Sequence, residues 1–144
     1  MQTVKHVIIS AAGMGTRLEM NMPKCLVEIA GKKIIQGLLE LVSDFDDVRV
    51  VVGFMEEEVI REVNKIRKDV VFVRNSDYRT TSNCHSIYLA THNLKDPFLI
   101  IDGDLIIDKD SFLSFLKECK LDQSLIGITP SKTEDAVFVN VDSS

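Results

Sequence analysis

The chain has 144 residues, the size of one domain, and 45% of them are hydrophobic, which is enough to form a buried core. Its 17 Lys and Arg against 22 Asp and Glu leave a formal charge of -5, which argues against a surface that binds nucleic acid or another polyanion. A single nucleotide is not excluded, because it needs only one or two well-placed cations.

Targeting and redox signals are weak in this sequence. The apolar run at residues 7–12 is too short for a membrane span or a signal peptide, and Gly13 ends it. Cys25, Cys84 and Cys119 are far apart and form no C-x-x-C pattern, which argues against a disulfide framework and a structural zinc site. We therefore expect a cytoplasmic protein with reduced cysteines and no membrane partner. A homo-oligomer stays open.

Strand-like and helix-like patterns alternate along the chain. Short β-branched runs predict buried strands, and apolar residues spaced three and four apart predict helices. In chain order, the predicted elements are a strand at 4–10, a helix at 34–42, a strand at 48–52, a helix at 56–68, a strand at 70–73, a short helix ending at 90, a strand at 97–102, a helix at 111–120, and strands at 125–129 and 136–141. The polar residues 75–82 are predicted to form a loop.

Helix ends and connections complete the fold prediction. Ser82 or Asn83 is expected to cap the helix ending at 90, and Asp110 or Ser111 the helix at 111–120. Strands that alternate with helices predict an α/β fold, a Rossmann-like three-layer α/β/α sandwich with a mostly parallel sheet and right-handed crossovers. No repeat or linker interrupts the pattern, so one domain is expected.

A glycine-rich loop follows the first predicted strand. Small residues there let a ligand approach the backbone, and exposed N–H groups can surround phosphate oxygens. A dinucleotide fingerprint counted from Gly13 would need a glycine at Leu18, and a Walker loop would need Gly-Lys at Leu18-Glu19. Both are excluded. The candidate nucleotide-binding residues of this loop are Ala11, Ala12, Gly13, Met14, Gly15 and Thr16.

Two cations close to this loop strengthen the case for an anion site. A G-x-G pattern alone can be a simple tight turn, and isolated cations can be solvated surface residues. Here Arg17 follows the loop directly, and Lys24 follows Pro23 a few residues later. A planar bidentate guanidinium and a point-charge ammonium beside the loop favour phosphate binding.

Two carboxylates follow the predicted strand at 97–102. Asp102-Gly103-Asp104 would face the glycine loop if this strand lay beside the first strand. Side chains at i and i+2 of an extended chain point to the same side. Two carboxylates near a triphosphate suit Mg²⁺, although an Asp- and Gly-rich turn without a metal is the alternative.

These residues in this order resemble the signature of the sugar-nucleotidyltransferase (MobA-like NTP transferase) superfamily. Within it, the chain is most similar to the bacterial choline-phosphate cytidylyltransferase group. The matching segments are residues 11–18, Pro23-Lys24, residues 26–32, Val52-Gly53-Phe54, Asn75, Tyr78, residues 81–86 and Gly103-Asp104. The resemblance implies the fold of nucleotide-diphospho-sugar transferases, in which the backbone of residues 11–15 holds the base and the phosphates.

The resemblance also implies roles for individual side chains. Arg17 would stabilise the leaving pyrophosphate, and Lys24 would contact the α-phosphate or the incoming phosphate. Asp104 would bind Mg²⁺, the expected cofactor. Asn83 and its neighbours would line the site of the base or ribose, and Asp102 is a further candidate for nucleotide binding. The expected partners are an NTP, with CTP favoured, and a small phosphorylated substrate.

One departure from the family pattern concerns length. Relatives of this kind run well beyond 144 residues, and their second metal-binding carboxylate lies in that later part. Asp135 and Asp142 do not fit its place. We therefore expect residues 1–144 to form a single nucleotidyltransferase domain that is incomplete at its C-terminal end and binds Mg·NTP better than it turns it over.

Two functions of other classes stay open. A nucleotide-binding module, regulatory or one half of a split site, would bind Mg·NTP without releasing pyrophosphate. A metal-dependent glycosyltransferase shares this type of sheet and places carboxylates at a strand end, but it has no need of the glycine loop with Arg17 and Lys24. The histidines are not required as bases, because an acceptor phosphate is already an anion.

Overall fold

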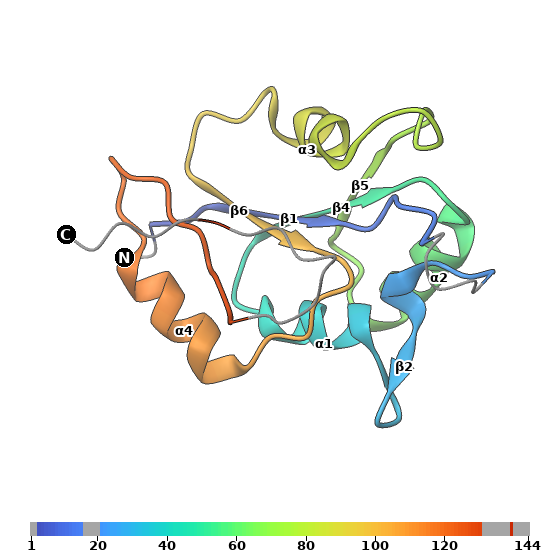
Figure 1. Cartoon of the computed structure of the whole chain (residues 1–144), viewed down its shortest axis with the longest axis horizontal. Helices are drawn as coiled ribbons and strands as arrows, with labels where there is room; N and C mark the ends of the chain where they lie inside the picture. The colour runs from blue at the N-terminus through green and yellow to red at the C-terminus, as the bar shows by residue number, and fades with distance from the viewer. Residues whose placement is uncertain (1–2, 16–20, 131–138, 140–144) are drawn as a thin grey trace.

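The computed structural model describes residues 3–15, 21–130 and 139. Its centre is a four-stranded parallel sheet in the order β5-β4-β1-β6 (Figure 1). The strands are β1 (His6–Ser10), β4 (Asp47–Val52), β5 (Val71–Arg74) and β6 (Phe98–Asp102). In register, Ser10 lies beside Val51 on one side and Asp102 on the other, so these strands end at the same edge.

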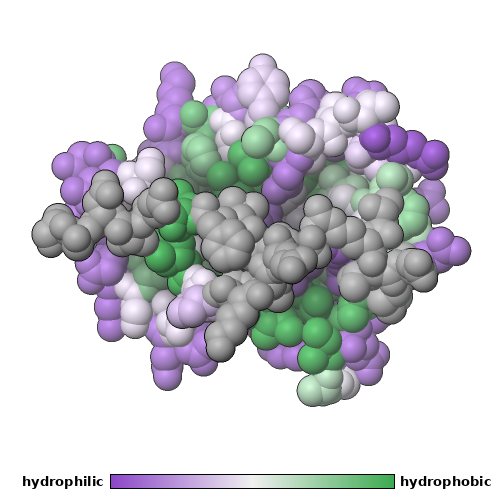
Figure 2. Space-filling view, viewed as in Figure 1, coloured by the Kyte–Doolittle hydropathy of each residue, from purple (hydrophilic) through white to green (hydrophobic). Residues whose placement is uncertain are grey.

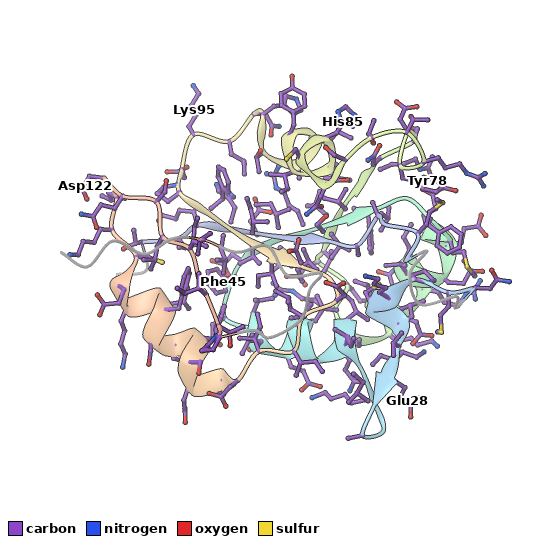
Figure 3. The ribbon with its side chains drawn as sticks, viewed as in Figure 1. Glu28, Phe45, Tyr78, His85, Lys95 and Asp122 are labelled. Carbon is purple, nitrogen blue, oxygen red and sulfur yellow. The ribbon has the colours of Figure 1, made fainter. Side chains whose placement is uncertain are left out.

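Helices cover both faces of the sheet, which confirms the three-layer sandwich (Figure 1). Helices α1 (Ile34–Leu41), α2 (Glu56–Ile66) and α4 (Lys109–Glu118) pack on one face. Figure 3 shows Phe45, which is 4% exposed, among the side chains of this larger core. Helix α3 (Asn83–Thr91) covers the other face, where Ala90 packs with Ile8 and Val51.

A small hairpin between β1 and α1 was not predicted. A 3₁₀ turn, η2 (Lys24–Leu26), leads into the antiparallel strands β2 (Glu28–Ile29) and β3 (Lys32–Lys33). The two residues between them, Ala30 and Gly31, have positive φ angles of 52° and 78°, as a tight two-residue hairpin turn requires. Figure 2 shows hydrophobic residues at the surface in this part of the molecule. Ile29 of β2 is 46% exposed.

Two sequence predictions are wrong, and a third concerns residues that lie almost entirely outside the described ranges. Helix α4 begins at Lys109 and its cap is Asp108, whose carboxylate accepts from the Ser111 amide at 2.9 Å, so neither Asp110 nor Ser111 is the cap. Residues 125–129 form no strand, because no strand in the described ranges pairs with them and side chains such as Ile126 (74% exposed) face solvent. The strand predicted at 136–141 lies, apart from Val139, outside the described residues.

The other predicted elements are present with ends shifted by one or a few residues. Ser82 is the N-cap of α3 as expected, although its side chain makes no capping hydrogen bond. The predicted loop at 75–82 is confirmed. Within the described ranges, no helix combines the length and the apolar character needed to cross a bilayer.

Candidate active site

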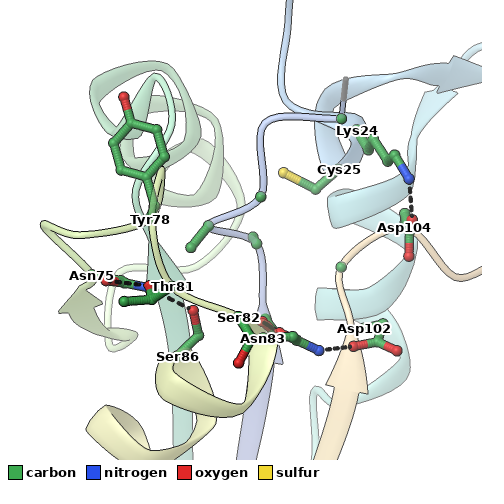
Figure 4. Close-up of a pocket in the computed structure, with 16 residues that line it drawn as sticks. Lys24, Cys25, Asn75, Tyr78, Thr81, Ser82, Asn83, Ser86, Asp102 and Asp104 are labelled. Carbon is green, nitrogen blue, oxygen red and sulfur yellow. Dashed lines mark hydrogen bonds and ion pairs between the residues drawn. The ribbon is translucent and has the colours of Figure 1, made fainter. Parts of the chain in front are cut away.

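A cleft of about 290 Å³ opens at the carboxyl ends of β1 and β6 (Figure 4). Its walls are the loop after β1, the start of η2, the loop that precedes α3, and the turn after β6. This is the edge at which open parallel sheets bind ligands, because the chain leaves neighbouring strands in different directions there. The cleft therefore brings together the glycine loop and the Asp-Gly-Asp segment, as the sequence predicts.

Close backbone contact joins these two segments. The Gly103 amide donates to the Ser10 carbonyl at 2.8 Å. A Cβ atom on Gly103 would lie 2.7 Å from that same carbonyl oxygen and 3.2 Å from Ala11 Cα. Because real side chains do not tolerate such an approach, only glycine fits between the two carboxylates of Asp102-Gly103-Asp104.

An ion pair spans one side of the cleft. Lys24 Nζ donates to Asp104 Oδ2 at 3.1 Å, and their side chains are 34% and 41% exposed. Gly15, which has a φ of 61°, lies against the Lys24 side chain, since an added Cβ would be 2.9 Å from Lys24 Cγ. The glycine loop thus packs directly on the lysine that the sequence assigned to phosphate binding.

Neutral hydrogen bonds form the opposite wall. Asn75 is 1% exposed, and its Nδ2 donates to Thr81 Oγ1 and to Ser86 Oγ, each at 3.0 Å. Its Oδ1 accepts from the Asp77 amide at 3.1 Å. A buried amide with partners on both ends fixes the loop before α3 on that helix.

A second chain of hydrogen bonds crosses the floor of the cleft. Ser10 Oγ donates to Asn83 Oδ1. Asn83 Nδ2 in turn donates to Asp102 Oδ1 at 2.9 Å (Figure 4). Asp102 and Asp104 both line the cleft, but the chain turns after β6, so the two carboxylates have different partners.

A thiol also lines the cleft beside Lys24. Cys25 is 2% exposed, and burial raises the pKa of its thiol to about 12, with the Asp104 charge acting in the same direction. A thiol with such a pKa stays protonated at neutral pH and is a poor nucleophile. Cys25 is therefore not a candidate nucleophile at neutral pH.

Residues 7–140 match the family of MobA-like NTP transferase domains. The chain belongs to this nucleotidyltransferase family. This MobA-like domain is 33% identical over 113 residues to the bifunctional protein GlmU of Methanococcus vannielii. GlmU of Francisella philomiragia is 32% identical over 124 residues. The alignments cover 76% and 83% of this chain but only 26% and 27% of those proteins.

Solved structures show the same fold. The CTP:phosphocholine cytidylyltransferase LicC of Streptococcus pneumoniae is 32% identical, with a TM-score of 0.62 over 70% of this chain and 45% of that one. The inositol-1-phosphate CTP transferase of T. maritima has a TM-score of 0.67 at 17% identity, and 82% of this chain and 51% of that one align. The MobA-like domain therefore spans about a quarter to a half of the length of these relatives.

Most of the predicted site residues meet in the cleft of this MobA-like domain. Those that line it are Ala11, Ala12, Gly13, Gly15, Lys24, Asn83, Asp102 and Asp104. Met14 belongs to the same loop, but the cleft-lining set of described residues does not include it. The predicted contributions of Thr16 and Arg17 fall outside the described residues.

Ser10 and Cys25 also line the cleft, and neither is a predicted site residue. For Ser10 a signal was available, since a hydroxyl in the last position of a buried β-branched strand has to find a partner at the ligand edge. Further lining residues are matches to the family pattern without a predicted role of their own: Asn75, Tyr78, Thr81, Ser82, Ser86 and Gly103.

Proposed function

We propose that this chain is the nucleotide-binding part of a magnesium-dependent nucleotidyltransferase. The reaction would transfer CMP from CTP to a small phosphorylated substrate such as phosphocholine and release pyrophosphate. The observation that carries the proposal is the cleft in which Lys24 and Asp104 meet beside the glycine loop. The preference for CTP and phosphocholine rests on the likeness to the pneumococcal CTP:phosphocholine cytidylyltransferase.

The side chains at the cleft fit a magnesium site that is completed by the nucleotide. Mg²⁺ prefers one or two carboxylates together with phosphate and water oxygens. Asp104 supplies a half-exposed carboxylate at the cleft, and Asp102 supplies a second one nearby. No cluster of three His, Cys, Asp or Glu occurs in the described ranges, which suits an ion that is held largely by a triphosphate. When bound, Mg²⁺ would neutralise charge on the phosphates.

The proposed reaction depends on positioning of the reactants and on neutralisation of their charge, and it needs little covalent catalysis by the protein. An oxygen of the acceptor phosphate would attack the α-phosphorus in line, forming a new P–O bond while the bond to the β-phosphate oxygen breaks and pyrophosphate leaves. Lys24 would leave its ion pair with Asp104 and donate to the phosphate oxygens, and Asp104 would turn to the metal. Arg17 would stabilise the leaving group. Exposed backbone N–H groups after β1 would hold the phosphates.

A second function, binding of Mg·NTP without turnover by these 144 residues, is favoured by one observation. The chain spans 45% of the pneumococcal cytidylyltransferase and 26% of the GlmU of M. vannielii. A second protein ligand to the metal matters more for nucleotidyl transfer than for binding of Mg·NTP. The reason is that the triphosphate itself supplies much of the coordination of the bound metal.

Pyrophosphate release tests both functions. The 144-residue chain and a longer chain from the same gene would be assayed with CTP, UTP, ATP and GTP against phosphocholine, phosphoethanolamine and sugar 1-phosphates. We expect metal-dependent release with CTP by the longer chain and slow release by the shorter one. Release of a nucleoside diphosphate from a nucleotide sugar would contradict the proposal and point to glycosyl transfer. Rapid release by the 144-residue chain would exclude the binding-only function.

A further inference from the structure

Ser10 connects three elements of the cleft through one side chain. It ends β1, and its register partner across the sheet is Asp102 of β6. Its hydroxyl donates to Oδ1 of Asn83, the first residue of α3, whose Nδ2 donates to Asp102 Oδ1 at 2.9 Å. All three residues line the cleft. A strand residue thus sets the contact between a helix and the carboxyl end of a second strand.

The chemistry of the three groups fixes the direction of this chain. An ionised carboxylate only accepts hydrogen bonds, so the amide nitrogen of Asn83 has to face Asp102. The amide oxygen is then left for Ser10, whose hydroxyl can rotate to donate. With the amide held at both ends, Asn83 keeps one N–H for a ligand. In the described part of the chain, Asp102 Oδ2 takes no hydrogen bond from the protein.

We infer that Ser10 is a positioning residue for the nucleotide and acts through Asn83. The inference rests on the proposed function, because the ligand that it positions is the nucleotide of that reaction. Ser10→Ala would leave Asn83 Oδ1 without its donor, and the amide could then turn its donor edge away from the cleft. Removal of one neutral hydrogen bond corresponds to about a three- to tenfold loss of affinity.

The decisive experiment is a double-mutant cycle on the 144-residue chain, with the dissociation constant of Mg·CTP measured by calorimetry. Ser10→Ala is expected to weaken binding about three- to tenfold in the wild-type background. In an Asn83→Ala background the same change is expected to have no effect, because the group through which Ser10 acts is already absent. A general disturbance of the fold would weaken binding in both backgrounds.

Further variants and a spectroscopic measurement distinguish a local effect of Ser10 from a general disturbance of the fold. Ser10→Thr keeps the hydroxyl on a β-branched strand residue and should restore affinity. Ser114→Ala removes an exposed hydroxyl on α4, away from the cleft, and should change nothing. In the ligand-free protein, the side-chain NH₂ resonances of Asn83 should exchange faster with water in Ser10→Ala than in the wild type.

The possible results separate this inference from the proposed function. Unchanged affinity in Ser10→Ala, or an equal loss in both backgrounds, would overturn the role of Ser10 while the nucleotide site stands. If the wild-type chain binds none of Mg·CTP, Mg·UTP, Mg·ATP and Mg·GTP, the proposed function fails and the inference fails with it.

Discussion

The two ends of the same sheet use charged side chains in opposite ways. At the amino end, Asp47 accepts from His6 Nδ1 at 2.6 Å and from Arg49 Nη2 at 3.0 Å, and Arg49 also donates to the Ala90 carbonyl at 3.1 Å. At the carboxyl end, Asp104 has Lys24 as its charged partner, at 3.1 Å.

The exposed fractions of these charged side chains also differ between the two ends of the sheet. The side chains of His6 and Arg49 are 16% and 17% exposed, whereas those of Lys24 and Asp104 are 34% and 41% exposed. A carboxylate surrounded by its own protein's donors has little left for a ligand, while a half-exposed pair beside a cleft can open and turn to one. The charged groups at the amino end are therefore held within the fold, and those at the carboxyl end are accessible to a ligand.

The largest expected effect is loss of activity at the carboxyl end. In a chain that catalyses nucleotidyl transfer, Asp104→Asn should lower kcat/KM by about a hundredfold or more, because the carboxylate that we propose as a magnesium ligand loses its charge. The matched control is Asp47→Asn, the same change of charge at the amino end, and it should leave kcat/KM within a few-fold of wild type. An equal loss of kcat/KM in the two variants would contradict the proposed functional difference between the two ends of the sheet.

Lys24→Ala should have a similar effect on turnover, about a hundredfold, since the positive charge that we propose to contact the phosphates is lost. It should also raise the dissociation constant of Mg·CTP in the 144-residue chain, which calorimetry would measure. Lys117→Ala, on an exposed position of α4, is the control for loss of a surface lysine. A Lys24 variant that binds and turns over like the control would show that this ion pair is not part of the site.

Gly103→Ala tests how tightly the carboxyl ends of β1 and β6 meet. The new Cβ would lie 2.7 Å from the Ser10 carbonyl oxygen, so we expect a loss of about 1–3 kcal/mol in the free energy of unfolding. Gly37→Ala in α1 is the control, because its Cβ would meet nothing within 4 Å, and a helical position should gain up to about 1 kcal/mol. Urea titration measures both. A stable Gly103 variant would contradict the close approach of the two strands.

The smallest effect is expected at the amino end and concerns pH. Arg49, and then His6, hold the pKa of Asp47 below its ordinary value of 3.8. A depressed carboxylate pKa stabilises the folded state above the ordinary value, and this stability disappears as the pH falls through the lowered pKa. Asp47→Asn should therefore lower the free energy of unfolding by about 1 kcal/mol at neutral pH, and the difference from wild type should vanish in acid. A difference that persists at low pH would rule out the charge as its cause.

The sequence predicted the parts of the site that depend on strand order and missed those that depend on side-chain pairing. The sequence brings the glycine loop and Asp104 together on the condition that the first and fourth predicted strands are neighbours, and the register of β1 with β6 meets this condition. The hydrogen bond between Ser10 and Asn83 joins residues 73 positions apart. The hydrophobic pattern of the sequence does not predict such a contact, because the contact depends on how α3 packs on the sheet.

The start of α4 shows a local limit of the same kind. Asp108, Asp110 and Ser111 are all good capping residues, and the sequence alone does not decide between them. The structure selects Asp108, because its carboxylate reaches both the amide and the hydroxyl of Ser111, at 2.9 and 3.1 Å.

The most direct test of the central claim is the melting temperature of the 144-residue chain with each of the four Mg·NTPs. We predict that Mg·CTP raises it and that EDTA abolishes the shift, because the site that we propose in the carboxyl-end cleft would hold the nucleotide together with its metal. A ligand at 100 times its dissociation constant stabilises the fold by about 2.7 kcal/mol, which a melting curve resolves easily. If no NTP shifts the melting curve even at millimolar concentration, the cleft is not a nucleotide site and the account is wrong.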